Sequence, residues 1–393
     1  MKQQLEKWYT APILSALTWF GFHCGSGFAS GSQMKIYAIK YGRMGLLVPL
    51  VAWVSCALFI GIVTEYARLV QAKSYRDVGK TIYWDSPVIG RIVLLVWDLM
   101  LFSAMIVSSG ACVSGLGTLL ENLFGFPYFV GCAAFVVFMT LLMCFSGQIV
   151  NRLGKVTIPM IVLFVAVAAI GIWQGAPGLR EVMTTARGAS AVEGATLGTV
   201  AWSGFTYGCI QISFLHTASI IGGSFRSRKQ TWTFVIAGFL INFLCMLLGV
   251  LAILAYYPDC MSSEMPMLYL VTRFSGPVGA VLLIVYNFIL FMAYITTAGS
   301  LLTGSIARYK PIIGKVIHSD FACKAIVVVV IMSGAALLAA LGLEGVLSKG
   351  YGTLAKLKMP LWFFPIMILG PISIRRVSRR TRPRSAWNTS SAR

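Results

Sequence analysis

Ser26-Gly27-Phe28-Ala29-Ser30-Gly31 and Ser203-Gly204-Phe205-Thr206-Tyr207-Gly208 are the two stretches that decide how this chain folds. Both read Ser-Gly-Phe-x-x-Gly, and each lies in an apolar segment long enough to span a bilayer. Glycine is a poor helix former and leaves backbone polar groups open. In lipid, such groups are tolerated only where protein or a water-filled cavity receives them. The two stretches therefore predict two interrupted membrane helices around a central site.

The composition is that of an integral membrane protein. Of the 393 residues, 58% are hydrophobic and only 11% are charged, whereas soluble domains carry about 25% charged residues. The mean hydropathy is +0.82, and we predict one membrane domain, residues 1–393, without a separate soluble domain. The net charge of +20 lies in short loops and in a C-terminal segment. This distribution is typical of a topology signal and of attraction to anionic lipid headgroups, not of nucleic-acid binding.

Ten apolar segments reach the length of about 20 residues that a membrane helix needs. Most of the 32 Lys and Arg residues lie on the side of the N-terminus, the even-to-odd loops and the C-terminus. By the positive-inside rule, both termini are expected in the cytoplasm. The basic residues assigned to the opposite loops are Lys35, Lys40, Arg43, Arg180, Arg187, Arg273, Lys349, Lys356 and Lys358. The ten segments are residues 11–39, 45–71, 88–120, 127–147, 155–174, 196–222, 230–257, 277–307, 323–342 and 355–373.

The two Ser-Gly-Phe motifs lie in segments that run in opposite directions. The first segment enters from the cytoplasm, and the sixth, after five crossings, enters from outside. This arrangement is typical of two inverted five-helix repeats whose first helices are discontinuous. We expect the first repeat at residues 11–174, the second at 196–373 and a flexible, basic cytoplasmic tail at 374–393. The alternative is a chance match among residues that are common in membrane helices.

The first break offers backbone groups for binding. A half-helix that begins after Gly27 points its free N–H groups and its positive dipole end toward the membrane centre, where a carboxylate binds readily. Gly25, Ser26, Gly27 and Phe28 are therefore candidate substrate-binding residues. Carbonyl groups released around Phe20 and His23 are candidate cation ligands. The alternative is a continuous glycine-rich helix packed tightly against a neighbour.

The string Gly25-Ser26-Gly27-Phe28 is similar to a signature in the first helix of amino acid–polyamine–organocation transporters. The longer stretch, residues 25–33, resembles the corresponding segment of the YkvI-like bacterial membrane proteins, a branch of that superfamily with the LeuT fold. Ser26 replaces the usual Ala, and Ser32-Gln33 replaces the usual Gln-Glu, which removes a carboxylate. The resemblance implies the ten-helix inverted-repeat fold and a place in the bacterial cytoplasmic (inner) membrane. It implies the fold more securely than the substrate.

Two further elements gain meaning from this resemblance. Ala293-Tyr294-Ile295-Thr296-Thr297 is similar to an element that completes a sodium site in sodium-coupled transporters of this fold. Thr296 and Thr297 are thus candidate sodium ligands, although threonine in membrane helices often hydrogen-bonds its own backbone. In the sixth segment, Trp202, Ser203, Gly204 and Phe205 are candidate substrate-binding residues, because the superfamily uses an aromatic residue of this helix to cover the substrate. Lipid-facing or packing roles for these aromatic rings are the alternative.

Two ionisable residues lie within predicted spans, where such residues are functional candidates. His23 lies beside the first break and is a candidate proton carrier; the alternative is a neutral imidazole that hydrogen-bonds a carbonyl group of the broken helix. Asp98 lies in the third span, two to three turns from its cytoplasmic end. It is a candidate gate or proton residue, and pairing with an arginine of an inner loop is the interpretation we favour.

These patterns predict a secondary active transporter. The expected activity is symport of a small solute, most simply an amino acid or related zwitterion, with sodium or protons by alternating access. The alternatives are a ligand-sensing receptor that retains the transporter fold and, less favoured, a passive channel. No ATP-binding, hydrolase or zinc motif is present in the sequence, so we expect no enzyme and no cofactor other than a bound sodium ion. The expected partners are the solute, the coupling ion and membrane lipids; the sequence does not determine the oligomeric state.

Overall fold

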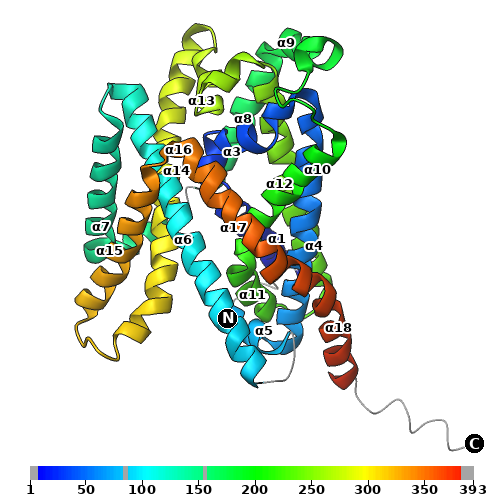
Figure 1. The fold of residues 1–393 in the computed structure, drawn as a ribbon, viewed down its shortest axis with the longest axis vertical. Coiled ribbons are helices and arrows are strands. Elements are labelled where there is room, and N and C mark those ends of the chain that lie inside the picture. The colour runs from blue at the N-terminus through cyan, green and yellow to red at the C-terminus, as the bar shows by residue number, and fades with distance from the viewer. Residues whose placement is uncertain (1–7, 83–86, 154–156, 382–393) are drawn as a thin grey trace, which may run out of the picture.

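The computed structural model describes residues 8–82, 87–153 and 157–381, and every regular element in these ranges is helical (Figure 1). The elements of the first half are α1 (Thr10–His23), α2 (Ser26–Ala29), α3 (Ser32–Tyr37), η1 (Ile39–Leu46), α4 (Leu47–Val70), α5 (Tyr75–Thr81), α6 (Pro87–Phe124), α7 (Tyr128–Leu153), α8 (Thr157–Gln174), α9 (Ala176–Thr184) and η3 (Ala186–Gly188).

The second half contains α10 (Leu197–Gln211), η4 (Ile212–Phe214), α11 (Leu215–Ser224), α12 (Arg228–Leu254), η5 (Asp259–Ser262), α13 (Pro266–Thr272), α14 (Gly276–Ile313), α15 (Asp320–Ala339), α16 (Gly342–Gly345), η6 (Val346–Gly350), α17 (Tyr351–Lys358), η7 (Met359–Phe363) and α18 (Phe364–Thr381). One end of the bundle carries α5, α11 and the end of α18, and we call it the α5 end; the opposite end carries α9 and α13, and we call it the α13 end (Figure 1).

The first membrane segment is interrupted, as the sequence predicts. α1 ends where the N–H of Cys24 donates to the carbonyl oxygen of Phe20 at 2.8 Å, and Gly25 is extended, with φ −83° and ψ −167°. A second bend follows at Gly31, whose φ of +81° is favourable for glycine and strained for other residues. The chain therefore crosses this region as two half-helices, α1 and α3, joined by the short turn α2.

The sixth segment is also interrupted, but not at the predicted motif. α10 runs without a break through Ser203–Gly208 and ends at Gln211, where the 3₁₀ turn η4 precedes α11. The glycines of the motif serve close packing against α4: a Cβ on Gly204 would lie 3.0 Å from the Val48 carbonyl oxygen, and one on Gly208 would lie 2.7 Å from the Ala52 carbonyl oxygen. The prediction of a break at Ser203–Gly208 was wrong because small residues also let two membrane helices approach closely.

Seven described helices are long and apolar enough to cross a membrane, or eight when the pair Pro159–Gln174 and Ala176–Thr184, bent by 71°, is taken as one span. The two interrupted segments fall outside this number because neither half reaches 18 residues. The total of ten stays a prediction that depends on how these segments are counted.

The last span differs from its predicted limits at both ends. The chain is helical from Gly342 to Thr381 through two π-helical turns, η6 and η7. Lys349, Lys356 and Lys358, which the sequence placed in an outer loop, therefore belong to this helix. The predicted tail at 374–393 is helical as far as Thr381; the rest of it, 382–393, lies outside the described residues.

Candidate functional site

A cavity of about 550 Å³ lies at the first break and extends from it toward the α5 end. Its walls come from both interrupted segments and from α14, and a smaller part comes from α6 and α17. Six residues that the sequence singled out line it: His23, Gly25, Ser26, Gly27, Thr296 and Thr297. Ser108, Gln211 and His216 also face this space. The structure thus brings the first break and the paired threonines together, although about 270 residues separate them in the chain.

Two of the residues that the sequence singled out in the first segment, Phe20 and Phe28, do not line the cavity. Phe20 and Phe28 are 1% exposed, and their rings meet edge to face with centroids 5.8 Å apart. Phe28 also packs on Phe164 of α8 at 5.1 Å. The carbonyl oxygen of Phe20 already accepts the capping hydrogen bond of α1. The side chains of both residues therefore pack against the break on the side away from the cavity.

The predicted residues of the sixth segment lie away from the cavity. Trp202 is 56% exposed on the outside of the bundle, and Phe205 packs on Phe363 with centroids 4.9 Å apart. The hydroxyl of Ser203 donates to the Tyr37 carbonyl oxygen at 2.8 Å, and Gly204 faces α4. None of these four lines the cavity. They are displaced because α10 stays helical until Gln211, three residues beyond the end of the motif.

The paired threonines have different surroundings. The hydroxyl of Thr296 donates to the Met292 carbonyl oxygen of its own helix at 2.9 Å. The side chain of Thr297 faces the first break: a Cβ on Gly25 would lie 3.4 Å from its Oγ1 and 3.3 Å from its Cγ2. Within the described residues, the Thr297 hydroxyl makes no hydrogen bond. Hydroxyl and carbonyl oxygens suit a hard cation such as sodium. The hydroxyl oxygen of Thr297 lies beside the break and is therefore the candidate side-chain ligand.

His23 joins the two interrupted segments. Its Nδ1 lies 3.2 Å from Oδ1 of Asn242 in α12, and its Nε2 lies 3.2 Å from the carbonyl oxygen of Gln211 at the end of α10. The amide nitrogen of Asn242 donates to the Gly238 carbonyl oxygen at 2.7 Å, which leaves Oδ1 facing the imidazole. Both ring nitrogens therefore meet acceptors. A neutral imidazole donates only one hydrogen bond, whereas the protonated ring donates to both.

Lys358 is a functional candidate that the sequence analysis missed. It is 0% exposed, and its ammonium group donates to the Ile210 carbonyl oxygen at 2.8 Å and to the Ser213 hydroxyl at 2.5 Å. A cation is favourable at the C-terminal end of a helix such as α10. The available sequence signal was the position of Lys358 at the start of the apolar segment 355–373, but the sequence analysis assigned the residue to a loop.

Other contacts also bring cavity residues together. The hydroxyl of Tyr207 donates to Oε1 of Gln33 at 3.2 Å, which links the two interrupted segments on the side of the break toward the α13 end. The hydroxyl of Tyr351 in α17 donates to Ser108 in α6 at 2.9 Å. Tyr351 gave no sequence signal, because its segment was expected to begin four residues later.

Asp98 lies outside the cavity, in an ion-pair cluster near the α5 end. Its Oδ2 accepts from Arg76 of α5 at 2.7 Å and from Arg308 of α14 at 2.6 Å, and its Oδ1 accepts from the Tyr75 hydroxyl. These contacts tie the α4–α6 connection to α14. The geometry matches the pairing with an inner-loop arginine that the sequence favoured.

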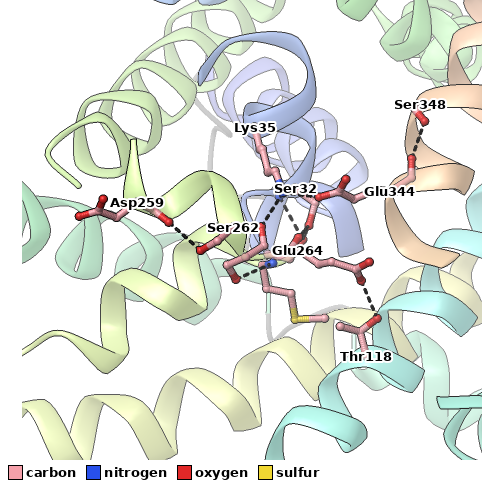
Figure 2. Close-up of polar contacts among 11 residues, drawn as sticks. Ser32, Lys35, Thr118, Asp259, Ser262, Glu264, Glu344 and Ser348 are labelled. Atoms are coloured by element: carbon pink, nitrogen blue, oxygen red, sulfur yellow. Dashed lines mark hydrogen bonds and ion pairs between the residues drawn. The ribbon is translucent and has the colours of Figure 1, made fainter. Parts of the chain in front are cut away.

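At the α13 end, a polar network covers the first segment (Figure 2). The ammonium group of Lys35 in α3 pairs with Glu344 in α16 and donates to the Ser263 carbonyl oxygen at 2.8 Å. The Ser32 hydroxyl donates to the Glu264 carbonyl oxygen at 2.5 Å, and the Glu264 carboxylate accepts from Thr118 of α6 at 3.2 Å. Partial burial raises the pKa of Glu264. The network fastens α3 to the α12–α13 connection and to the start of the last span.

This arrangement of helices is the LeuT fold. The manganese transporter of Eremococcus coleocola superposes with a TM-score of 0.61 at 13% identity, over 96% of this chain and 87% of that one. A Na⁺-coupled sialic acid symporter gives a TM-score of 0.60 at 15% identity, over 92% and 78%. MhsT in complex with L-phenylalanine gives 0.55 at 16% identity, over 96% and 99%. No protein-family profile matches the sequence, and no curated protein matches it. The chain is thus a multi-pass membrane protein with the fold of these transporters.

Proposed function

We propose that the protein is a secondary active transporter that carries a small zwitterionic solute together with a cation by alternating access. The observation that carries this proposal is the cavity at the first break, which extends toward one end of the bundle while a polar network covers the other end. A substrate site that is reached from one side at a time is what alternating access requires. The fold shared with a sodium-coupled symporter supports the same activity.

The charge of the cavity favours a solute without net charge. Its lining contains no Asp, Glu, Lys or Arg among the described residues. A net anion or cation would leave water there without a counter-charge on the cavity wall, which is costly in a low-dielectric site; the ammonium group of Lys358 does not line the cavity and is held by Ile210 and Ser213. A zwitterion meets the free N–H groups of Ser26, Gly27 and Phe28 with its carboxylate, as the sequence predicts. Ser108 and Thr297 offer oxygen atoms to its ammonium group. An amino acid is the simplest solute of this class.

A transition metal is a poor candidate for the cargo. The described residues contain no group of three or more His, Cys, Asp or Glu side chains that could hold a metal ion. Thiolate, imidazole and carboxylate groups are the usual ligands of such ions. The manganese specificity in the name of one structural neighbour therefore does not transfer to this chain on its residues.

Two coupling ions fit the site. Sodium would use Thr297 with carbonyl oxygens of the break, and a proton would use His23, which faces two acceptors. By the positive-inside rule, the α5 end faces the cytoplasm. The structure then corresponds to a state in which the cavity faces inward and the network of Lys35 and Glu344 closes the outer side.

The proposal is tested by thermal stabilisation of the purified protein with a panel of amino acids, in sodium and in potassium buffer. A ligand stabilises the folded state in proportion to its binding. For Thr297→Ala, we expect the sodium concentration that gives half of the ligand-induced shift to rise about tenfold, because one charge-assisted contact to the ion is lost. The matched control is Thr140→Ala, whose hydroxyl donates only to Val136 of its own helix at 2.7 Å.

The outcomes separate the coupling ions. A sodium-dependent shift that Thr297→Ala weakens and Thr140→Ala leaves unchanged supports the cation site. A ligand-induced shift that is the same in sodium and in potassium favours coupling to a proton carried by His23. If no amino acid or related zwitterion shifts the melting temperature in either buffer, the substrate class is wrong.

Glu344→Gln is expected to raise the population of outward-open molecules about fivefold. The pair with Lys35 is half-exposed on the glutamate side, at 41%, and such a pair contributes about 1 kcal/mol. The measurement is the rate at which an impermeant thiol reagent, added from the outer side, modifies Ser108→Cys in the cavity. Asp259→Asn is the control, because this carboxylate lies in η5, in the α12–α13 connection that the network fastens, but is 66% exposed and 3.7 Å from Arg187. Equal rates in the two variants would contradict a role for the Lys35–Glu344 pair in closure.

A further inference from the structure

A second and larger space lies on the outside of the bundle. It is a groove of about 830 Å³ between α4, α12 and α18, separate from the central cavity. α18 and α4 lie side by side toward the α5 end (Figure 1). Along α4 the groove extends from Val54 to Arg68, which is about 20 Å at 1.5 Å per residue. This length matches one leaflet of a bilayer whose apolar core is about 30 Å thick.

The walls of the groove are apolar and open to the membrane. Leu58 of α4 is 51% exposed and Ile236 of α12 is 55% exposed. Gly61 lies at the bottom of the groove and has no side chain to fill it; a Cβ there would meet only Val235, at 3.6 Å. A flexible hydrocarbon chain fits such a furrow, because its contacts need no fixed polar partner.

The mouth of the groove at the α5 end is basic. Four arginines line it, namely Arg68, Arg228, Arg375 and Arg379, against the single carboxylate Glu65. Glu65 is neutralised by Arg68, which holds it with two hydrogen bonds of 2.9 and 2.7 Å. Among the described residues, the other three arginines have no carboxylate partner; Arg228 only lies over the ring of Trp232, at 6.0 Å. Three guanidinium groups are thus available to an anion at the membrane surface.

We propose that this groove binds an anionic phospholipid, with its phosphate headgroup among Arg228, Arg375 and Arg379 and one acyl chain between α4 and α12. Guanidinium groups bind phosphate oxygens in a bidentate manner. An apolar furrow one leaflet long that ends in unpaired arginines is complementary to this class of lipid and not to a neutral one. The lipid bridges α18 to α12, both of which pack on α4.

The test uses Trp232 as a probe, because it lines the groove and is 44% exposed. The full chain is placed in nanodiscs of phosphatidylcholine with increasing fractions of phosphatidylglycerol brominated on one acyl chain. The quenching of Trp232 is the difference between the protein and its Trp232→Phe variant. We expect half-maximal quenching at a lower lipid fraction for brominated phosphatidylglycerol than for brominated phosphatidylcholine. Millimolar inorganic phosphate is expected to leave the quenching unchanged.

A charge-matched pair of variants isolates the groove. Arg228→Gln with Arg375→Gln should shift the midpoint about 25-fold, at roughly fivefold for each arginine. Arg226→Gln with Arg376→Gln removes the same charge from neighbouring positions that do not line the groove, and a shift of less than about threefold is expected. Gly61→Leu, which keeps the charge and fills the floor, should reduce the maximal quenching.

Two results would overturn the proposal. If brominated phosphatidylcholine quenches Trp232 at the same fraction as phosphatidylglycerol, the groove takes bulk lipid without selection. If the two double variants shift the midpoint equally, the attraction is that of a general basic surface and not of this mouth. The substituted arginines are exposed and form no ion pair with any described residue, so the elution profile of each variant should stay that of the unchanged protein.

Discussion

Gly238→Ala is expected to lower the free energy of unfolding by about 3 kcal/mol. Gly238 of α12 faces Trp19 of α1: an added Cβ would overlap Cε3 of the indole and lie 2.6 Å from Cζ3. The indole ring has no room to move, because it is 0% exposed. It stacks on Phe214 with ring centroids 5.8 Å apart and meets Trp53 edge to face with centroids 6.4 Å apart. Overpacking at this point pushes α12 away from α1, directly below His23.

The matched control for this prediction is Gly304→Ala. Gly304 also lies in a long helix, α14, but a Cβ there would meet only Met105, at 3.9 Å. We expect this variant to be unchanged or stabilised by about 0.5–1 kcal/mol, because alanine is the better helix former. Both variants are compared by denaturant unfolding followed through helix content. A loss of stability that is the same at the two positions would contradict the packing of Trp19 against Gly238.

His23→Leu is the second large effect, with an expected loss of about 2–4 kcal/mol. The imidazole lies between Asn242 Oδ1 and the Gln211 carbonyl oxygen, and leucine removes the ring N–H donor, which serves one of these buried acceptors in the neutral ring and both in the protonated ring. Each buried group left unsatisfied costs about 1–3 kcal/mol. Because these contacts hold the end of α1 to the end of α10, the variant should also weaken ligand binding in the cavity.

A double-mutant cycle distinguishes this role from simple packing. Asn242→Leu removes one of the two acceptors, so its cost and that of His23→Leu should not add, with an interaction energy of at least about 0.5 kcal/mol. His216→Leu is the control histidine, because its Nδ1 lies 2.8 Å from the Ser213 carbonyl oxygen within its own turn. Additive costs for His23 and Asn242, or an equal cost for His216→Leu, would show that the bridge between the interrupted segments contributes little.

The sequence by itself determined the class of the protein, the fold and the first break. Low charge and long apolar segments leave a chain no alternative to helices in lipid, where every backbone group needs an internal partner. The first break was predictable because Gly25, Ser26 and Gly27 combine poor helix propensity with polar side chains and backbone. The approach of Thr297 to this break was expected from the resemblance of its short motif.

Only the tertiary structure decided where the sixth segment breaks and which residues meet there. A glycine in a membrane helix indicates either unwinding or close helix packing, and the neighbouring helix selects between them. α4 packs against Gly204 and Gly208, so α10 continues to Gln211 and carries Trp202 and Phe205 away from the cavity. The contact of His23 with Asn242, 219 residues further along the chain, has no local signature. Such a contact depends on how whole helices pack, which a pattern of neighbouring residues does not encode.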